Sequence, residues 1–215
     1  MNYNIISTGS KGNAVVINKE ILIDCGVPFK ALTNIAAEIK LVLLTHEHGD
    51  HFNRRTIKRL SNERPTLRFA CCEWLADMLK AEAVPRKNID VLEPGKKYSY
   101  GTFCVSPVKL YHNVPNCGWR VYQNGEKMFY ATDTNTLDGI TAKGYDLYMI
   151  ECNYEDEEIR NRIKEKQEQG QYAYETEVIH NHLSKAKCDD FIVSNAADNS
   201  AYVYLHMHEG VKCND

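Results

Sequence analysis

A buried strand that ends directly in a cluster of histidines and an aspartate constrains this chain more than any other feature. The apolar run Leu41 to Leu44 is followed by Thr45-His46-Glu47-His48-Gly49-Asp50-His51. Imidazole and carboxylate groups are ligands for zinc and its first-row neighbours. Four such groups in so short a loop can serve two ions only where a turn spreads them, and Gly49 permits such a turn. The sequence therefore predicts a metal-binding loop at the end of a strand.

Further ligand candidates follow other apolar runs, at the point where each predicted strand ends. They are His112 after Tyr111, Asp133 after Ala131-Thr132, and His206 after Tyr202 to Leu205. Asp24 after Ile21 to Ile23 shares this strand-end position but has a different expected role. Asp24 can accept a hydrogen bond from a ligand histidine and so orient it. Taken singly, each residue is equally well explained as an ordinary loop residue. Their shared position at strand ends predicts that they complete the site.

Composition excludes several classes of protein. The chain has 215 residues, 43% of them hydrophobic, and we expect a single domain over residues 1–215. No apolar run approaches the roughly 18 residues of a membrane span, and the first residues lack a secretory pattern, so we expect a soluble cytoplasmic protein. A net charge of -3 gives no overall attraction for nucleic acid. The eight cysteines form no C-x-x-C pair, and we interpret them as reduced thiols.

Strand and helix patterns alternate along the whole chain. Helical spacing of apolar residues predicts helices over 28–39, 54–62, 71–83, 155–169 and 184–195. Short apolar runs between them predict strands, and Gly9-Ser10-Lys11-Gly12-Asn13 predicts a turn between two of these strands. The mixture predicts a layered α/β or α+β domain with helices outside the sheets.

In their order along the chain, these motifs resemble the metallo-β-lactamase fold hydrolase superfamily over essentially its whole length. The residues that carry the resemblance are Leu22-Ile23-Asp24-Cys25-Gly26, Thr45 to His51, His112, Ala131-Thr132-Asp133-Thr134 and a final histidine. It implies a four-layer αββα sandwich with a dinuclear metal site at one edge. It also implies that one ion is bound by His46, His48 and His112, the other by Asp50, His51 and His206, with Asp133 bridging both. His208 competes with His206, which we prefer because it directly follows the strand.

Three further motifs are similar to the small phosphodiesterase and nuclease branch of that superfamily. They are the turn at 9–13, Glu151-Cys152-Asn153-Tyr154 and His182-Leu183-Ser184. The nearest groups are the YycJ/WalJ-type exonucleases and the phage-encoded cyclic-nucleotide phosphodiesterases that counter Pycsar immunity. The resemblance implies that His182 is the proton donor at the scissile phosphate and that His180 is a bystander. The chain departs from the exonuclease pattern at His112-Asn113, where His-Asp is expected, and at His206-Met207-His208, where His-Leu-Ser is expected.

We therefore expect a hydrolase that uses two divalent metal ions to cleave small or cyclic nucleotide phosphodiesters, with phage immune evasion as one biological setting. Zinc is the first expectation, and manganese and iron accept the same ligands. A hydroxide between the ions attacks phosphorus, His182 protonates the leaving alkoxide, and Asp50 is essential for metal and activity alike. If Ser184 caps the following helix, the amides at its start face the same phosphate and Ser184 is a candidate phosphate contact.

Two alternatives remain open from the sequence. The same site can serve an exonuclease on DNA or RNA ends, an interpretation favoured by the basic stretch Arg54, Arg55, Lys58, Arg59, Arg64 and Arg68. That stretch is equally explained as a solvated helix face. The second alternative, from another class, is a metal-binding protein without turnover. The resemblance additionally implies a homodimer.

Overall fold

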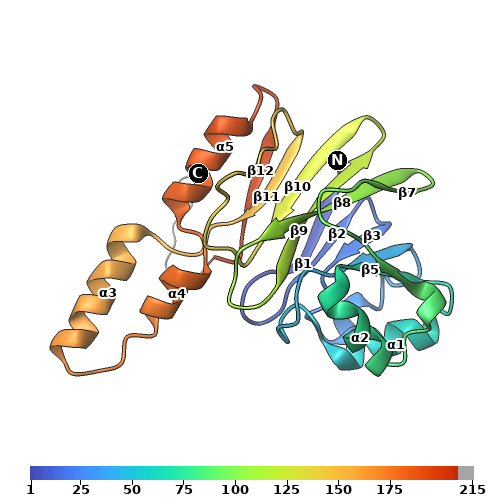
Figure 1. The fold of residues 1–215 in the computed structure, drawn as a ribbon, viewed down its shortest axis with the longest axis horizontal. Coiled ribbons are helices and arrows are strands. Elements are labelled where there is room, and N and C mark those ends of the chain that lie inside the picture. The colour runs from blue at the N-terminus through green and yellow to red at the C-terminus, as the bar shows by residue number, and fades with distance from the viewer. Residues whose placement is uncertain (208–215) are drawn as a thin grey trace.

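Two six-stranded sheets form the centre of the structure, which is a computed structural model describing residues 1–207 (Figure 1). The first sheet has the order β1 (Tyr3–Ser7), β2 (Ala14–Ile17), β3 (Ile21–Ile23), β4 (Leu41–Leu43), β5 (Arg68–Cys71) and β6 (Ile89–Val91). The second has the order β12 (Ala201–Leu205), β11 (Leu147–Glu151), β10 (Glu126–Ala131), β9 (Asn116–Gln123), β8 (Phe103–Leu110) and β7 (Tyr98–Tyr100).

Each sheet contains a run of parallel strands. β3, β4, β5 and β6 pair in parallel in the first sheet, and β10, β11 and β12 pair in parallel in the second. Parallel strands place their carboxyl ends at one edge of the sheet, and in such sheets that edge is where functional loops gather. The residues that follow these strands are therefore brought together although they lie far apart in the sequence.

Three buried clusters of apolar side chains separate four layers. One lies between the first sheet and the helices η1 (Phe29–Leu32), α1 (Arg54–Glu63) and α2 (Glu73–Ala81). The second lies between the two sheets and includes Trp119, Tyr130 and Met149. The third lies between the second sheet and α5 (Lys185–Asn195). Helices thus cover the outer faces of both sheets, as the αββα expectation requires.

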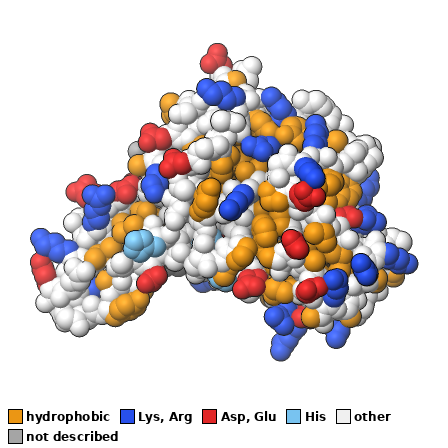
Figure 2. Space-filling view, viewed as in Figure 1, with side chains coloured by type: hydrophobic (Ala, Val, Ile, Leu, Met, Phe, Trp, Pro, Cys, Tyr) orange, Lys and Arg blue, Asp and Glu red, His pale blue; other side chains and the backbone are white. Residues whose placement is uncertain are grey.

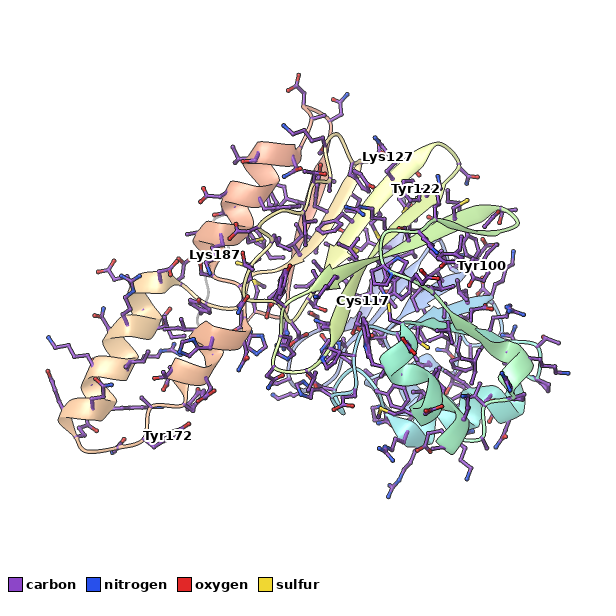
Figure 3. The ribbon with its side chains drawn as sticks, viewed as in Figure 1. Tyr100, Cys117, Tyr122, Lys127, Tyr172 and Lys187 are labelled. Carbon is purple, nitrogen blue, oxygen red and sulfur yellow. The ribbon has the colours of Figure 1, made fainter. Side chains whose placement is uncertain are left out.

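A helical arm extends from the body of the sandwich. It consists of α3 (Asp156–Glu168) and α4 (Glu175–Asn181), which project beside α5, with Tyr172 at the far end of the arm (Figures 1 and 3). α4 ends directly before His182. The short helix η2 (Arg86–Asn88) completes the elements. None of the helices in residues 1–207 has both the length and the apolar character needed to cross a membrane.

The expected helix over 28–39 is the main error in the predicted elements. Phe29, Leu32, Ala36 and Ile39 are buried as their spacing predicts. The backbone, however, forms only the 3-10 helix η1 followed by turns, one of which is closed by Ala36 N–H donating to Leu32 O. A tighter 3-10 turn brings side chains three apart to the same face, so the apolar spacing fits both structures. α4 was not expected from the sequence, whereas α1, α2, α3 and α5 lie where helices were predicted.

Substitution of Ile21 tests the cluster between the sheets. Ile21 is fully buried in β3, so Ile21→Ala removes packed atoms and leaves a cavity. We expect the free energy of unfolding to fall by about 2–5 kcal/mol. Val193 on α5 is 82% exposed, and Val193→Ala should change it by less than about 0.5 kcal/mol. Urea denaturation of both variants is the measurement, and equal effects would contradict this assignment of the core.

Candidate metal centre

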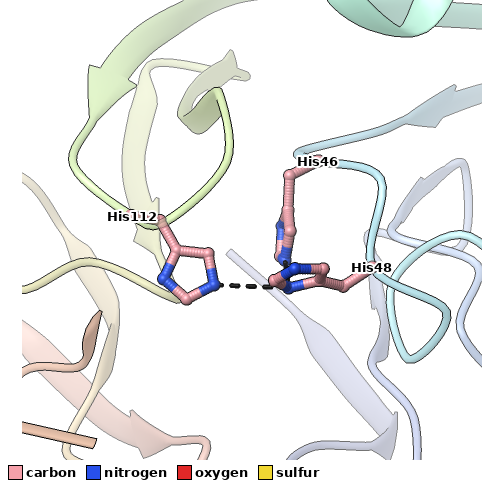
Figure 4. A group of neighbouring side chains, drawn as sticks. All are labelled: His46, His48 and His112. Atoms are coloured by element: carbon pink, nitrogen blue, oxygen red, sulfur yellow. Dashed lines mark hydrogen bonds between the residues drawn. The ribbon is translucent and has the colours of Figure 1, made fainter. Parts of the chain in front are cut away.

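The first group of candidate ligands consists of three histidines from two loops. His46 and His48 lie in the loop after β4, and His112 lies in the loop after β8 (Figure 4). His48 Nδ1 is 3.2 Å from His46 Nε2 and 3.3 Å from His112 Nε2. His112 Nδ1 donates a hydrogen bond to the carbonyl of Asn181, which leaves Nε2 as the nitrogen that faces the cluster. The three nitrogens can hold one divalent metal ion.

The second group lies next to the first and contains the carboxylates. Asp133, directly after β10, places Oδ2 2.8 Å from His51 Nε2 and Oδ1 3.2 Å from His206 Nδ1. Asp50 Oδ2 is 3.6 Å from His51 Nε2. His46, His51 and Asp133 also form a close group, which places Asp133 between the two sets. The structure thus brings together all seven ligands that the sequence predicted.

Two buried atoms of this site support its interpretation as a metal centre. Asp133 Oδ2 and His206 Nδ1 are buried and have close charged neighbours, yet neither takes part in a hydrogen bond of normal geometry. Buried polar atoms usually have such a partner, so these two are suited to a metal ion. Burial holds the pKa of His46 well below its ordinary value, which favours the neutral imidazole that binds metals. The residues present therefore fit the divalent metal that the family resemblance implies.

Asp24 orients the metal-binding loop, as the sequence predicted for it. Its buried carboxylate accepts hydrogen bonds from the backbone N–H of Thr45 at 3.0 Å and from the Thr45 hydroxyl at 2.9 Å. His51 Nδ1 lies 2.7 Å from Asp24 Oδ2, so Nε2 of His51 points toward Asp133. Burial lowers the pKa of His51, but the carboxylates of Asp133 and Asp24 outweigh it and raise the pKa well above its usual range.

Asn13 contacts the predicted metal-binding loop, although the sequence predicted for it only a turn and a motif shared with the phosphodiesterase and nuclease branch. Its side-chain amide is buried and donates to the Asp50 carbonyl at 3.2 Å, and it lies 2.8 Å from His51 Nε2. The Asn13 backbone N–H donates to the same Asp50 carbonyl. The turn between β1 and β2 therefore holds two predicted metal ligands in place.

Glycines at positions 12 and 26 allow this close approach of three segments. A Cβ atom at Gly26 would lie 1.7 Å from the Asp50 carbonyl oxygen, and one at Gly12 would lie 2.6 Å from the Gly26 carbonyl oxygen. Gly49, to which we assigned the turn, has no left-handed φ, and a Cβ there would meet no atom within 4 Å. Gly49 does lie in a turn, which His51 N–H closes by donating to the His48 carbonyl at 2.9 Å, but the turn does not require a glycine there.

Glu151 also lies at the site, although the sequence placed it only in a motif and predicted no chemical role for it. It ends β11, is fully buried, and its Oε1 lies 2.5 Å from His182 Nδ1. Burial lowers the pKa of His182, but the Glu151 carboxylate outweighs this and raises the pKa above its ordinary value. The pair suits a histidine that carries a proton. A charged residue at the end of an apolar strand is the signal that identified Asp24 and Asp133, and it could have identified Glu151.

The other predicted site residues have simpler positions. Ser184 caps α5, with its buried hydroxyl accepting from Lys187 N at 3.4 Å, and its phosphate contact stays a prediction. His180 is exposed at the end of α4. His208, the competitor of His206, and Cys213 lie outside the described residues, so only the position of His206 is known.

The basic stretch mostly has local partners. Arg54 pairs with Glu82, Arg59 with Glu63 and Arg68 with Asp90, while Arg64 donates to backbone carbonyls. Within residues 1–207, Arg55 and Lys58 have no such contact. This distribution favours the solvated helix face over a continuous phosphate-binding surface.

The cysteines of residues 1–207 are not among the candidate metal ligands. Of the seven that the structure describes, six are buried and none forms a disulfide. Burial raises the pKa values of Cys25 and Cys117, which keeps both thiols protonated and unreactive. Cys117 lies on β9 between the sheets (Figure 3).

Known proteins with a similar sequence or a similar fold agree with the family that the motifs resemble. The family model described as the beta-lactamase superfamily domain matches residues 19–192. The exodeoxyribonuclease WalJ of Streptococcus pneumoniae is 24% identical over 180 residues. The match covers 74% of this chain but 65% of WalJ, just under two thirds.

The metallo-beta-lactamase fold protein YhfI from Bacillus subtilis superposes with a TM-score of 0.71 at 18% identity, over 97% of this chain and 87% of YhfI. Human tRNase Z, short form, gives a TM-score of 0.71 at 18% identity, over 96% and 92% of the two chains. The expected fold is confirmed.

Substitution of two glycines tests how the metal-binding loop is held. Gly26→Ala should push the Asp50 carbonyl away and lower both metal content and thermal stability, because backbone atoms cannot yield as a side chain does. Gly49→Ala lies in the same loop and should leave both unchanged. Metal content by elemental analysis and melting temperature are the measurements. Normal metal content in the Gly26 variant would disprove this role of the glycine.

Proposed function

Because this chain belongs to the beta-lactamase superfamily, we propose that it is a hydrolase that cleaves phosphodiester bonds with two divalent metal ions. The substrates are small or cyclic nucleotides, and His182 is the proton donor. Zinc is the metal that we put first. Two bound ions would supply a hydroxide nucleophile near neutral pH and neutralise charge that develops on the phosphate.

The observation that carries this proposal is the His182–Glu151 pair beside the ligand cluster. Cleavage of a phosphodiester releases an alkoxide, which is a poor leaving group unless it is protonated. Glu151 Oε1 binds Nδ1 of His182 and so leaves Nε2 to donate a proton. His182 is partly accessible, with 19% of its side chain exposed, as a group that must reach substrate requires.

Charge on the helical arm supports a small substrate. Residues 156–181 contain seven acidic and four basic side chains, and Figure 2 shows both kinds mixed over the arm. An arm of this composition next to the proton donor gives no attraction for a polynucleotide backbone. The local pairing of Arg54, Arg59 and Arg68 removes the other candidate surface.

Exonuclease activity on DNA or RNA ends is the second candidate, and the similarity to exodeoxyribonuclease WalJ favours it. The two candidates use the same site and differ only in what lies beyond the scissile phosphate. A panel of cyclic nucleotides and labelled single-stranded DNA and RNA, assayed with zinc and with manganese, separates them. We expect turnover of a cyclic or small nucleotide. Turnover of DNA alone would favour the second candidate, and turnover of neither would exclude both.

Two substitutions separate proton donation from metal binding. His182→Ala should keep its metal content but reduce turnover of natural phosphodiesters by about 100-fold to 10,000-fold. Asp50→Ala should lose metal and activity together. His180→Ala is the matched control, because this exposed histidine lies two residues away, and it should behave as the wild type. Full activity of His182→Ala would remove the argument for phosphodiesters.

Three further expectations belong to this proposal. The alternative of a metal-binding protein without turnover is supported if the metal-loaded protein cleaves no member of the substrate panel. A homodimer is implied by the family resemblance, and equilibrium sedimentation would refute it by giving the 24.6 kDa mass of one chain. A cytoplasmic location is expected, and cell fractionation tests it.

A further inference from the structure

Asn135 lies where three segments of the site meet. Its backbone N–H donates to the carbonyl of Tyr111 at 2.9 Å, directly before His112. Its side-chain amide donates to the carbonyl of His180 at 2.8 Å, near the end of α4. Its own carbonyl accepts from Lys187 Nζ at 2.8 Å. One residue thus contacts the chain on each side of His182 and the loop of a predicted metal ligand.

These contacts hold the chain before His182, whereas Leu183 after it is fully buried and has its own hydrogen bonds to Glu151 and Asn153. The end of α4 is held at the site by Asn135 on His180, by His112 Nδ1 on the Asn181 carbonyl, and by His182 on Glu151. The rest of the arm projects away from the sandwich (Figure 1). Lys187, labelled in Figure 3, belongs to the first turn of α5, which begins directly after His182-Leu183-Ser184.

We propose that Asn135 is a positioning residue that fixes His182 relative to the metal-ligand loop of His112. This inference rests on the proposed function, in which His182 protonates the leaving group. Misplacement of a catalytic group by about 1 Å can cost about 100-fold in rate. Loss of the Asn135 amide should therefore act mainly on the step in which the proton is transferred, because the Asn135 backbone N–H keeps its hydrogen bond to the Tyr111 carbonyl beside His112.

The leaving group gives the sharpest test. A thymidine dinucleotide releases an alkoxide that needs a proton, whereas thymidine 5′-(4-nitrophenyl phosphate) releases 4-nitrophenolate, which does not. Two variants remove the side-chain N–H: Asn135→Ala, and Asn135→Leu, which keeps a similar side-chain volume. Both should lower kcat on the dinucleotide by about tenfold to 100-fold. KM on the dinucleotide and kcat on the nitrophenyl ester should change by less than threefold. Asn199→Ala, an exposed asparagine between α5 and β12, is the control and should change neither.

A double substitution separates positioning from a general loss of structure. In the His182→Ala background there is no donor to position, so adding Asn135→Ala should cause no further loss on the dinucleotide. An equal fall on both substrates in the single variant, an additive loss in the double variant, or an unchanged kcat would each overturn the inference. If the wild type cleaves neither substrate nor any nucleotide of the panel, the proposed function itself fails.

Hydrogen exchange tests the same contact without relying on activity. Asn135→Ala should speed amide exchange over residues 175–182 by about tenfold, because the end of α4 has lost the hydrogen bond to the His180 carbonyl, and should leave β9 unchanged. Exchange at the wild-type rate over 175–182 would overturn the inference whatever the substrate of the protein.

Discussion

The carboxylate of Asp24, which has no exposed surface, accepts hydrogen bonds from the backbone and hydroxyl of Thr45 and lies against His51. Burial raises the pKa of Asp24, although His51 opposes that shift. A buried carboxylate without such partners would strongly destabilise the fold. The first sheet can therefore pack only if Thr45 and His51 are in place, and the loop geometry follows from the packing of β3 and β4. The metal centre is in this sense part of the core.

Much of this arrangement could be predicted from the sequence because the ends of parallel strands share an edge. That rule located Asp24, His112, Asp133 and His206 without any contact being known. The same rule would also have located Glu151, because its strand was predicted and a charged residue ends that strand. Asn13 could not be found in this way, because its role depends on the approach of a turn to a loop 37 residues further along the chain. The same limit applies to the basic stretch, whose acidic partners at Glu82 and Asp90 come from later elements.

The predicted metal ligands and His182, the proposed proton donor, are carried by different kinds of structure. The predicted metal ligands follow strands whose sheets are packed on both faces, and packing of this kind fixes their geometry. His182 instead lies between two helices, α4 and α5, at the base of the arm. Glu151 connects the strands with the base of the arm, since it ends the buried strand β11 and its carboxylate contacts His182.

The order of the strands has a consequence for the chain during its synthesis. Asp133, Glu151 and His206 stand at the ends of three neighbouring parallel strands, and the connection from β11 to β12 runs through α3, α4 and α5. Pairing between segments so far apart is a slow step in folding. A nascent chain that has not yet released β12 from the ribosome lacks His206 and the strand that positions it. The predicted set of metal ligands is therefore complete only after β12 has been made and has paired with β11.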